Sequence, residues 1–157
     1  MKVESVHYKR SRFSSRLPSQ YRYTPSHYWL RESEPGVWQV GFTRFATRML
    51  GDIVEFEFKV KPAASIEPGQ VIGWTEGFKA LSDVYSAASG EFLEVNSALN
   101  AAITLIDQDP YGAGWLYSVR GEPDPRSTDV NGYIAVLDAT IDTMLRSRHE
   151  AGETHNE

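Results

Sequence analysis

The sequence predicts a mainly β domain with short helices at its flanks, and three observations lead to this class. Residues 53–60 alternate between apolar and polar with period two, which is typical of a half-buried strand. Aromatic and β-branched residues fill 21–42 around a Pro-Gly turn signal at 35–36. The pattern glycine, acid, two apolar residues, glutamate, apolar residue occurs at 51–56 and again at 90–95. That repeat favours two similar β-units packed around a pseudo-twofold axis.

The first predicted elements are two strands, 26–32 and 37–42, which the turn signal joins as a hairpin. A helix of about two turns follows near 43–50, because Thr43 is a favourable N-cap residue and Gly51 a favourable stop. The sequence therefore places a short helix directly before the first repeated unit.

The strand at 53–60 divides its side chains between two faces. One face holds Ile53, Glu55, Glu57 and Lys59, and the other holds Val54, Phe56, Phe58 and Val60. A loop at 62–70 and a short buried strand at 71–74 complete the first unit. In the second unit we expect 103–106 to be the corresponding apolar strand.

The last part of the chain changes from strand to helix. A proline-broken loop at 121–129 offers Ser127, Thr128 and Asp129 as caps. Apolar residues then recur at spacings of three and four, namely Tyr133, Ile134, Leu137, Ile141, Met144 and Leu145. This spacing predicts an amphipathic helix near 130–148, with a basic C-terminal end.

The amino-acid composition excludes several classes of function. Its 157 residues, 41% hydrophobic and 24% charged, suit one ordinary globular domain. No apolar run approaches the roughly 20 residues of a membrane helix, and the first residues lack the apolar core of a secretory signal. The absence of cysteine excludes disulfides, thiolate metal sites and a cysteine nucleophile. With four histidines, a histidine-rich metal site is not expected, so we predict no metal.

Charge is unevenly distributed along the chain. Residues 1–22 hold six of the 16 Lys and Arg residues but one of the 21 acidic residues. The remainder is strongly acidic, which argues against nucleic acid as a partner. The basic, serine-containing head is read as a packed or flexible extension, an organelle transit peptide or a partner-docking arm. We expect a cytoplasmic bacterial protein, or an organelle matrix protein if the head is a transit peptide, with no membrane partner.

One lysine, Lys79, stands apart from the other cations of the chain. Between Lys61 and Arg120 it is the only positively charged residue. Its neighbours form a predicted exposed turn, with Glu76, Gly77, Phe78, Ala80, Ser82 and Asp83. Nothing nearby supplies the desolvating pocket or base that a Schiff-base lysine requires. A covalent arm on a protruding turn needs only exposure and a rigid scaffold beneath it.

Four stretches carry a resemblance to a known family: YTPSHYWL, VGFTRFATRMLGDIVEFEF, EGFKALSDVYSAASGEFLEVNSAL and LIDQDPYGAGWL. In order and spacing they resemble the H protein of the glycine cleavage system over about 21–120. The resemblance implies a lipoyl/biotinyl-type barrel-sandwich hybrid, a flattened pseudo-twofold β-barrel. It divides the chain into a basic N-terminal extension (1–20), a lipoyl domain with its C-terminal helix (21–149) and a frayed tail (150–157).

The resemblance also implies a role for Lys79. In the family the matching lysine carries lipoate in amide linkage, and a lipoate ligase or a lipoyl/octanoyl transferase attaches it. Biotin is disfavoured because biotinyl lysines usually lie between methionines, whereas Phe78 and Ala80 flank this one. The protein would then be a non-catalytic carrier that delivers its arm to successive enzymes at high effective concentration.

The chain departs from the family where the resemblance places a cleft for the loaded arm. The cleft candidates are Ser26, His27, Tyr28 and Met49. Tyr28 stands where a glutamate is usual and Met49 where a histidine is common, while Arg44 and Arg48 add positive charge. A less polar, more basic cleft favours an anionic sulfur cargo over an aminomethyl cation.

Three functions remain open on these residues. We favour the lipoate-binding branch that serves heterodisulfide-reductase-like sulfur oxidation. The first alternative is a glycine cleavage H protein, whose partners would be glycine decarboxylase, aminomethyltransferase and dihydrolipoyl dehydrogenase. The second alternative is an unmodified H-like scaffold that binds partners. The intact run E-x-x-K-A-x-S-D at 76–83 argues against the last.

Overall fold

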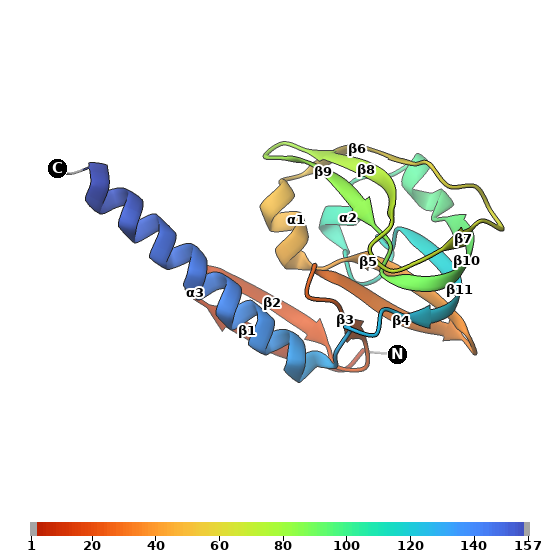
Figure 1. The fold of residues 1–157 in the computed structure, drawn as a ribbon, viewed down its shortest axis with the longest axis horizontal. Coiled ribbons are helices and arrows are strands. Elements are labelled where there is room, and N and C mark those ends of the chain that lie inside the picture. Colours follow the sequence, from red (N-terminus) through yellow and green to blue (C-terminus); the bar gives the residue numbers. More distant parts are fainter. Residues whose placement is uncertain (1–2, 156–157) are drawn as a thin grey trace.

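The computed structural model describes residues 3–155 and contains three antiparallel sheets (Figure 1). The six-stranded sheet contains, in spatial order, β3 (Arg22–Tyr23), β4 (Tyr28–Glu34), β5 (Val37–Phe42), β11 (Tyr117–Pro123), β10 (Ala88–Val95) and β7 (Ser65–Ile66). The three-stranded sheet contains β6 (Ile53–Phe58), β8 (Val71–Gly77) and β9 (Leu81–Tyr85). The third sheet is a hairpin of β1 (Ser5–Arg10) and β2 (Phe13–Pro18).

The helices are short except for the last. They are α1 (Arg44–Leu50), the 3₁₀ helix η1 (Ser97–Asn100), α2 (Leu105–Gln108) and α3 (Val130–His155). Within the described residues, none of them combines the length and the apolar character that crossing a membrane requires. The mainly β class and the helix near 43–50 are therefore confirmed.

Two apolar cores hold the sheets together. The first lies between the six-stranded and three-stranded sheets and includes Leu30, Val40, Ile72, Phe92 and Tyr117. The sheets form a flattened sandwich that does not close, since β3, β7, β6 and β9 remain at sheet edges. This agrees with the expected flattened barrel.

The second core covers the opposite face of the six-stranded sheet at its β3–β4 end. There Tyr23 and Trp29 pack against the β1–β2 hairpin, α3 and Phe45 of α1. Trp29 is fully buried, and its indole N–H donates to the Pro110 carbonyl at 2.8 Å. The β3–β4 end of the six-stranded sheet is thus buried on both faces, whereas Glu91 of β10 and Arg120 of β11 are exposed, and the three-stranded sheet has one face in solvent.

The predicted caps of α1 are confirmed. The Thr43 hydroxyl accepts a hydrogen bond from the Ala46 N–H, which satisfies an otherwise unpaired donor of the first turn. Gly51 ends the helix with φ +77°, a backbone conformation that glycine adopts at little cost. Asp129 caps α3 in the same way, because its carboxylate accepts the Gly132 N–H at 2.9 Å.

The prediction for the two faces of the strand at 53–60 is wrong at its start. Ile53 is buried and Val54 is exposed, whereas Phe56 and Phe58 are partly buried as expected. The pairing with β8 shifts register between Ile53 and Glu55. A bulge of this kind reverses which side chains face the core, so strict alternation fails across it.

The expected strand at 103–106 is also wrong. Ile103 and Thr104 form a turn, Leu105 and Ile106 begin α2, and Ile106 is 1% exposed in the first core. A run of four apolar residues fits a buried helix as well as a buried strand, so periodicity could not separate them. Within the loop expected at 62–70, Ser65 and Ile66 pair with β10 as a very short strand.

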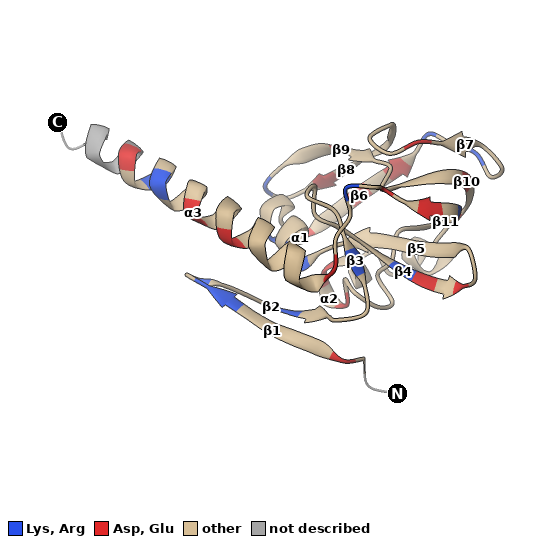
Figure 2. Ribbon diagram, turned by 60° about the horizontal axis from the view of Figure 1, so that its bottom comes forward, with Lys and Arg blue, Asp and Glu red and all other residues tan. Residues whose placement is uncertain are grey.

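The described residues near both chain ends form more regular structure than the sequence predicted. Residues 5–18 form the β1–β2 hairpin, and Arg10 bonds Asp138 and Asp142 of α3. Figure 2 shows the basic residues of the hairpin beside the acidic residues of α3. The helix continues through 150–155, where a frayed tail was expected, and 156–157 lie outside the described residues.

Candidate functional site

Lys79 lies in the turn between β8 and β9, where both Phe78 and Lys79 are exposed. The turn rests on the C-terminal end of α1. The Lys79 backbone N–H donates to the Leu50 carbonyl at 2.9 Å, and the Phe78 N–H donates to the Asp52 carbonyl at 3.1 Å. The first bond uses a carbonyl that the end of α1 leaves unpaired, and the second uses a carbonyl of the segment just beyond the helix, so the fold fixes the backbone of the turn.

Two glycines allow this close approach. A Cβ on Gly77 would lie 2.1 Å from the Leu50 carbonyl oxygen. A Cβ on Gly51 would lie 2.9 Å from the Lys79 nitrogen and 3.0 Å from its Cγ. Because Gly77 and Gly51 lack side chains, the turn can lie directly against the end of α1, and the stem of Lys79 can lie directly over Gly51.

The Lys79 side chain does not extend freely into solvent. Its Nζ donates to the Arg48 carbonyl at 3.3 Å, which lays the stem along the last turn of α1. No carboxylate pairs with it among the described side chains. It is an accessible primary amine, which an acyl donor can convert to an amide with the loss of one positive charge.

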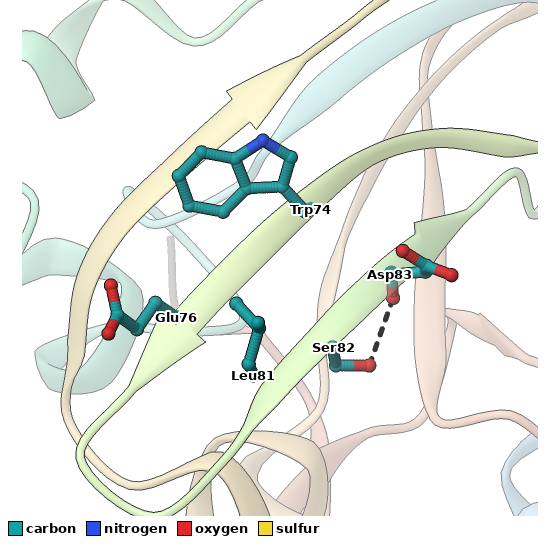
Figure 3. A pocket seen from close by; sticks show the side chains of 5 residues that line it. All are labelled: Trp74, Glu76, Leu81, Ser82 and Asp83. Atoms are coloured by element: carbon teal, nitrogen blue, oxygen red, sulfur yellow. Dashed lines mark hydrogen bonds between the residues drawn. The ribbon is translucent and has the colours of Figure 1, made fainter.

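A first cavity lies on the outer face of the three-stranded sheet and is called the outer cavity. Its volume is about 590 Å³, and it is lined by Trp74, Glu76, Leu81, Ser82 and Asp83 (Figure 3). Trp74 pairs across the ladder with Asp83, and Glu76 pairs with Leu81. Two carboxylates beside an indole suit a positively charged group.

A second cavity lies on the other side of the turn and is called the α1 cavity. Its volume is about 460 Å³, and it is lined by Ser14, Arg44, Thr47, Arg48, Gly51, Asp52, Phe78, Lys79 and Asp107. Among these, Ser14 comes from the β1–β2 hairpin. The Asp107 carboxylate is turned toward backbone, since it accepts the Ile53 N–H at 2.9 Å.

The four cleft candidates line neither of these two cavities. Tyr28 is buried in the first core, and its hydroxyl accepts the Tyr85 N–H at 3.0 Å. Burial raises the pKa of Tyr28 to about 12, so the phenol stays neutral. Ser26 is exposed and bonds Thr24, and Met49 is exposed on α1.

His27 belongs to the second core. Its ring lies 4.5 Å from the Phe45 ring, and Nδ1 shares a hydrogen bond of 2.8 Å with the Tyr133 hydroxyl. Burial lowers the pKa of His27 to about 4, so the ring is neutral near pH 7. These contacts give His27 a packing role between α1 and α3.

The structure brings the predicted turn residues together, since residues 76–83 surround Lys79 on the β8–β9 hairpin. The sequence prediction missed Trp74 and Leu81 as lining residues. The sequence did contain a signal for them. Residues 74 and 76, like residues 81 and 83, are two apart on a strand, which puts their side chains on one face of the sheet. Among the described residues, no three His, Asp or Glu side chains are placed to hold a metal ion.

Comparisons with known proteins agree on one family. The sequence profile described as Glycine cleavage H-protein matches residues 21–132. A glycine cleavage system H protein of Mycobacterium tuberculosis is 37% identical over 131 residues, which is 83% of this chain and 91% of that protein. One from Edwardsiella ictaluri is 37% identical over 128 residues, covering 79% and 98%.

A solved structure gives the same result for the fold. The crystal structure of a glycine cleavage system H protein from Mycobacterium marinum superposes with a TM-score of 0.68 at 32% identity. The match covers 76% of this chain and 97% of the other. The β1–β2 hairpin lies outside the profile match, as does most of α3.

Proposed function

The chain belongs to the glycine cleavage H-protein family, and from that premise we propose that Lys79 carries its lipoyl group and an aminomethyl cargo. Proteins of this family are non-catalytic carriers with lipoate joined to a lysine. The observation that carries the proposal is the placement of Lys79, an accessible amine on a turn that α1 holds rigid. The lipoyl group would supply the dithiol chemistry.

The partners follow from this role. A lipoate ligase or a lipoyl/octanoyl transferase would acylate Lys79, and the arm would then visit glycine decarboxylase, aminomethyltransferase and dihydrolipoyl dehydrogenase. The exposed side chains next to Lys79 support such visits, because Phe78 and Leu81 are 79% and 72% exposed beside the attachment point. Apolar groups exposed together at one site favour protein contact.

The sulfur-oxidation role favoured from the sequence is not supported. It depended on Tyr28 and Met49 lining the cleft in place of a carboxylate and an imidazole, and on the positive charge that Arg44 and Arg48 add. Tyr28 instead bonds backbone inside the core, so its identity carries no information about cargo charge. The glycine cleavage alternative fits the family better, and the outer cavity offers carboxylates next to the turn.

Two measurements test the proposal. Peptide mapping by mass spectrometry of protein from its native host should find the lipoyl mass on Lys79. The lipoylated protein should then support glycine–bicarbonate exchange by glycine decarboxylase within about twofold of an authentic H protein. A native protein without the modification would favour the scaffold alternative, and a lipoylated protein with no exchange would remove the glycine cleavage assignment.

A further inference from the structure

We propose that the outward face of the β1–β2 hairpin binds an acidic surface on the partner enzymes that receive the arm of Lys79. This surface is called the basic face, and it consists of His7, Lys9, Arg12 and Arg16. The inference rests on the proposed function, because it requires that partner enzymes approach Lys79. It concerns how a partner is recruited, and no catalytic step depends on it.

The hairpin buries one of its two faces in the second core. The residues that alternate with the buried ones point outward. His7 pairs with Arg16 across the hairpin, and both are exposed. Lys9 pairs with Ser14 in the same way, and Arg12 is exposed in the turn between the strands. No acidic residue occurs from position 5 to position 18, so the outward face carries charge of one sign.

The cations of the basic face differ from Arg10, which lies on the same strand as Lys9. Arg10 is held by two aspartates of α3, and these contacts fasten the hairpin to the helix. Among the described side chains, Lys9, Arg12 and Arg16 form no ion pair. The basic segments of β1 and β2 are blue in Figure 2. Folding therefore uses one cation of the hairpin and leaves the others available to an outside anion.

The basic face lies next to the attachment site. Ser14, which pairs with Lys9, also lines the α1 cavity together with Lys79. The cavity itself is mixed in charge, because its two arginines share it with two aspartates. The excess of positive charge therefore begins at the hairpin, beside the point where the arm leaves the protein. An enzyme that receives the arm would meet the attachment turn and the basic face together.

The chemistry of the basic face favours a protein partner that binds briefly. None of the exposed large apolar side chains lies between Ser5 and Pro18, so the hairpin has no anchor for a lipid bilayer. The net charge of −5 for the whole chain disfavours nucleic acid. Exposed ion pairs form quickly and are individually weak, which suits a carrier that must leave each enzyme in turn. The hairpin lies outside the family profile match, so this surface is a feature of the chain beyond the matched region.

The test is the KM of the lipoylated full-length protein in glycine–bicarbonate exchange by glycine decarboxylase. Lys9→Glu combined with Arg16→Glu should raise the KM about tenfold at about 0.05 M salt and leave kcat unchanged, because charge complementarity acts on the encounter. The increase should fall to less than about twofold at about 0.5 M salt, where screening is strong. Lys9→Gln combined with Arg16→Gln should raise the KM in the same direction by about threefold at about 0.05 M salt, because it removes the charge without reversing it.

The matched control is Lys59→Glu combined with Lys61→Glu. It changes the net charge by the same amount, on exposed residues beyond the end of β6 that is remote from the turn. Its KM should stay within about twofold of the unsubstituted value, because distant exposed charges are largely screened. Melting temperatures of all variants should lie within about 3 °C of the unsubstituted protein, since each replaces exposed residues.

The possible results separate this proposal from the proposed function. Equal KM values in the hairpin variants and the control would overturn the basic face and leave the proposed function intact. An unsubstituted lipoylated protein that supports no exchange would remove the glycine cleavage assignment, and this partner with it. Binding to phosphatidylserine vesicles, or self-association at low salt, that is lost in the hairpin variants at unchanged KM would assign the face to a membrane or to a second copy and would also overturn the proposal.

Discussion

The six-stranded and three-stranded sheets share one core, but they differ in what covers their outer faces. The β3–β4 end of the six-stranded sheet is covered by the second core, where Tyr23 and Trp29 are both fully buried. The outer face of the three-stranded sheet carries exposed side chains such as Leu81 and Glu76. The six-stranded sheet supports the fold, and the three-stranded sheet presents the turn with Lys79 to solvent.

This difference predicts where substitutions act. Under the second core, at the β3–β4 end of the six-stranded sheet, they should change stability, because they open cavities or break buried hydrogen bonds. On the three-stranded side they should change modification and partner contact at nearly constant stability.

The largest effect is expected from replacing the buried tryptophan of the second core. Trp29→Ala should lower the free energy of unfolding by about 3–5 kcal/mol, because it leaves a cavity and an unpaired Pro110 carbonyl. Trp74→Ala, on the three-stranded sheet, should cost less than about 1 kcal/mol. Urea denaturation of both variants measures this, and similar losses would remove the distinction between the sheets.

Acid should weaken the second core through His27. Its folded pKa of about 4 lies below the unfolded value of about 6.5, so the unfolded chain binds more protons between these pH values. Stability from this residue is fully present above pH 6.5 and declines by up to roughly 3 kcal/mol as pH falls to 4.

The control for that prediction is His27→Asn, since asparagine tolerates the positive φ of 74° at this position. Unfolding free energies measured at pH 7 and pH 4.5 should differ less in the variant than in the unsubstituted protein. An unchanged pH dependence would show that other groups cause it.

An intermediate effect is expected where the attachment turn meets α1. Gly77→Ala places a methyl group 2.1 Å from the Leu50 oxygen and should cost about 1–3 kcal/mol while displacing the turn. Gly36→Ala is the control, because it meets nothing within 4 Å and carries only the strain of its φ of +76°. Ligase-catalysed lipoylation should slow in Gly77→Ala alone, as followed by intact mass.

The smallest effect on stability is expected at the attachment residue. Lys79→Arg should change the free energy of unfolding by no more than about 0.5 kcal/mol, because the side chain is exposed, yet lipoylation should be lost. Lys59→Arg, at the far end of the same sheet, should keep both. A clear fall in melting temperature for Lys79→Arg would mean that the turn depends on this lysine for its structure.

Local signals in the sequence were enough to predict the hairpin, the caps of α1 and the amphipathic start of α3. Each depends on residues close together in the chain, such as Thr43 with Gly51. The errors arose where distant residues decide the outcome. The bulge in β6 exists only because β8 pairs with it, and residues 105–106 are helical where Ile106 packs into the first core.

The residues of the candidate site show the same difference between local and distant signals. Lys79 could be found because its isolation and its turn are properties of the sequence itself. The surroundings of His27 and Tyr28 could not be found, because which side of β4 meets α3 or β9 depends on packing over long separations. Ser14 was missed as a wall of the α1 cavity for that reason, since nothing in its neighbourhood points to α1.

The hydrogen bonds between the β1–β2 hairpin and α3 also affect the order in which parts of the protein fold. The Tyr8 hydroxyl donates to Asp138 across a sequence separation of 130 residues, and Arg10 reaches Asp142 across 132. Contacts of such separation form late, because a long loop must close before they stabilise anything. During synthesis β1 must therefore wait, with Tyr8 uncovered, until α3 has left the ribosome. The second core should be the last part of the protein to form and the part most exposed to misassembly at that stage.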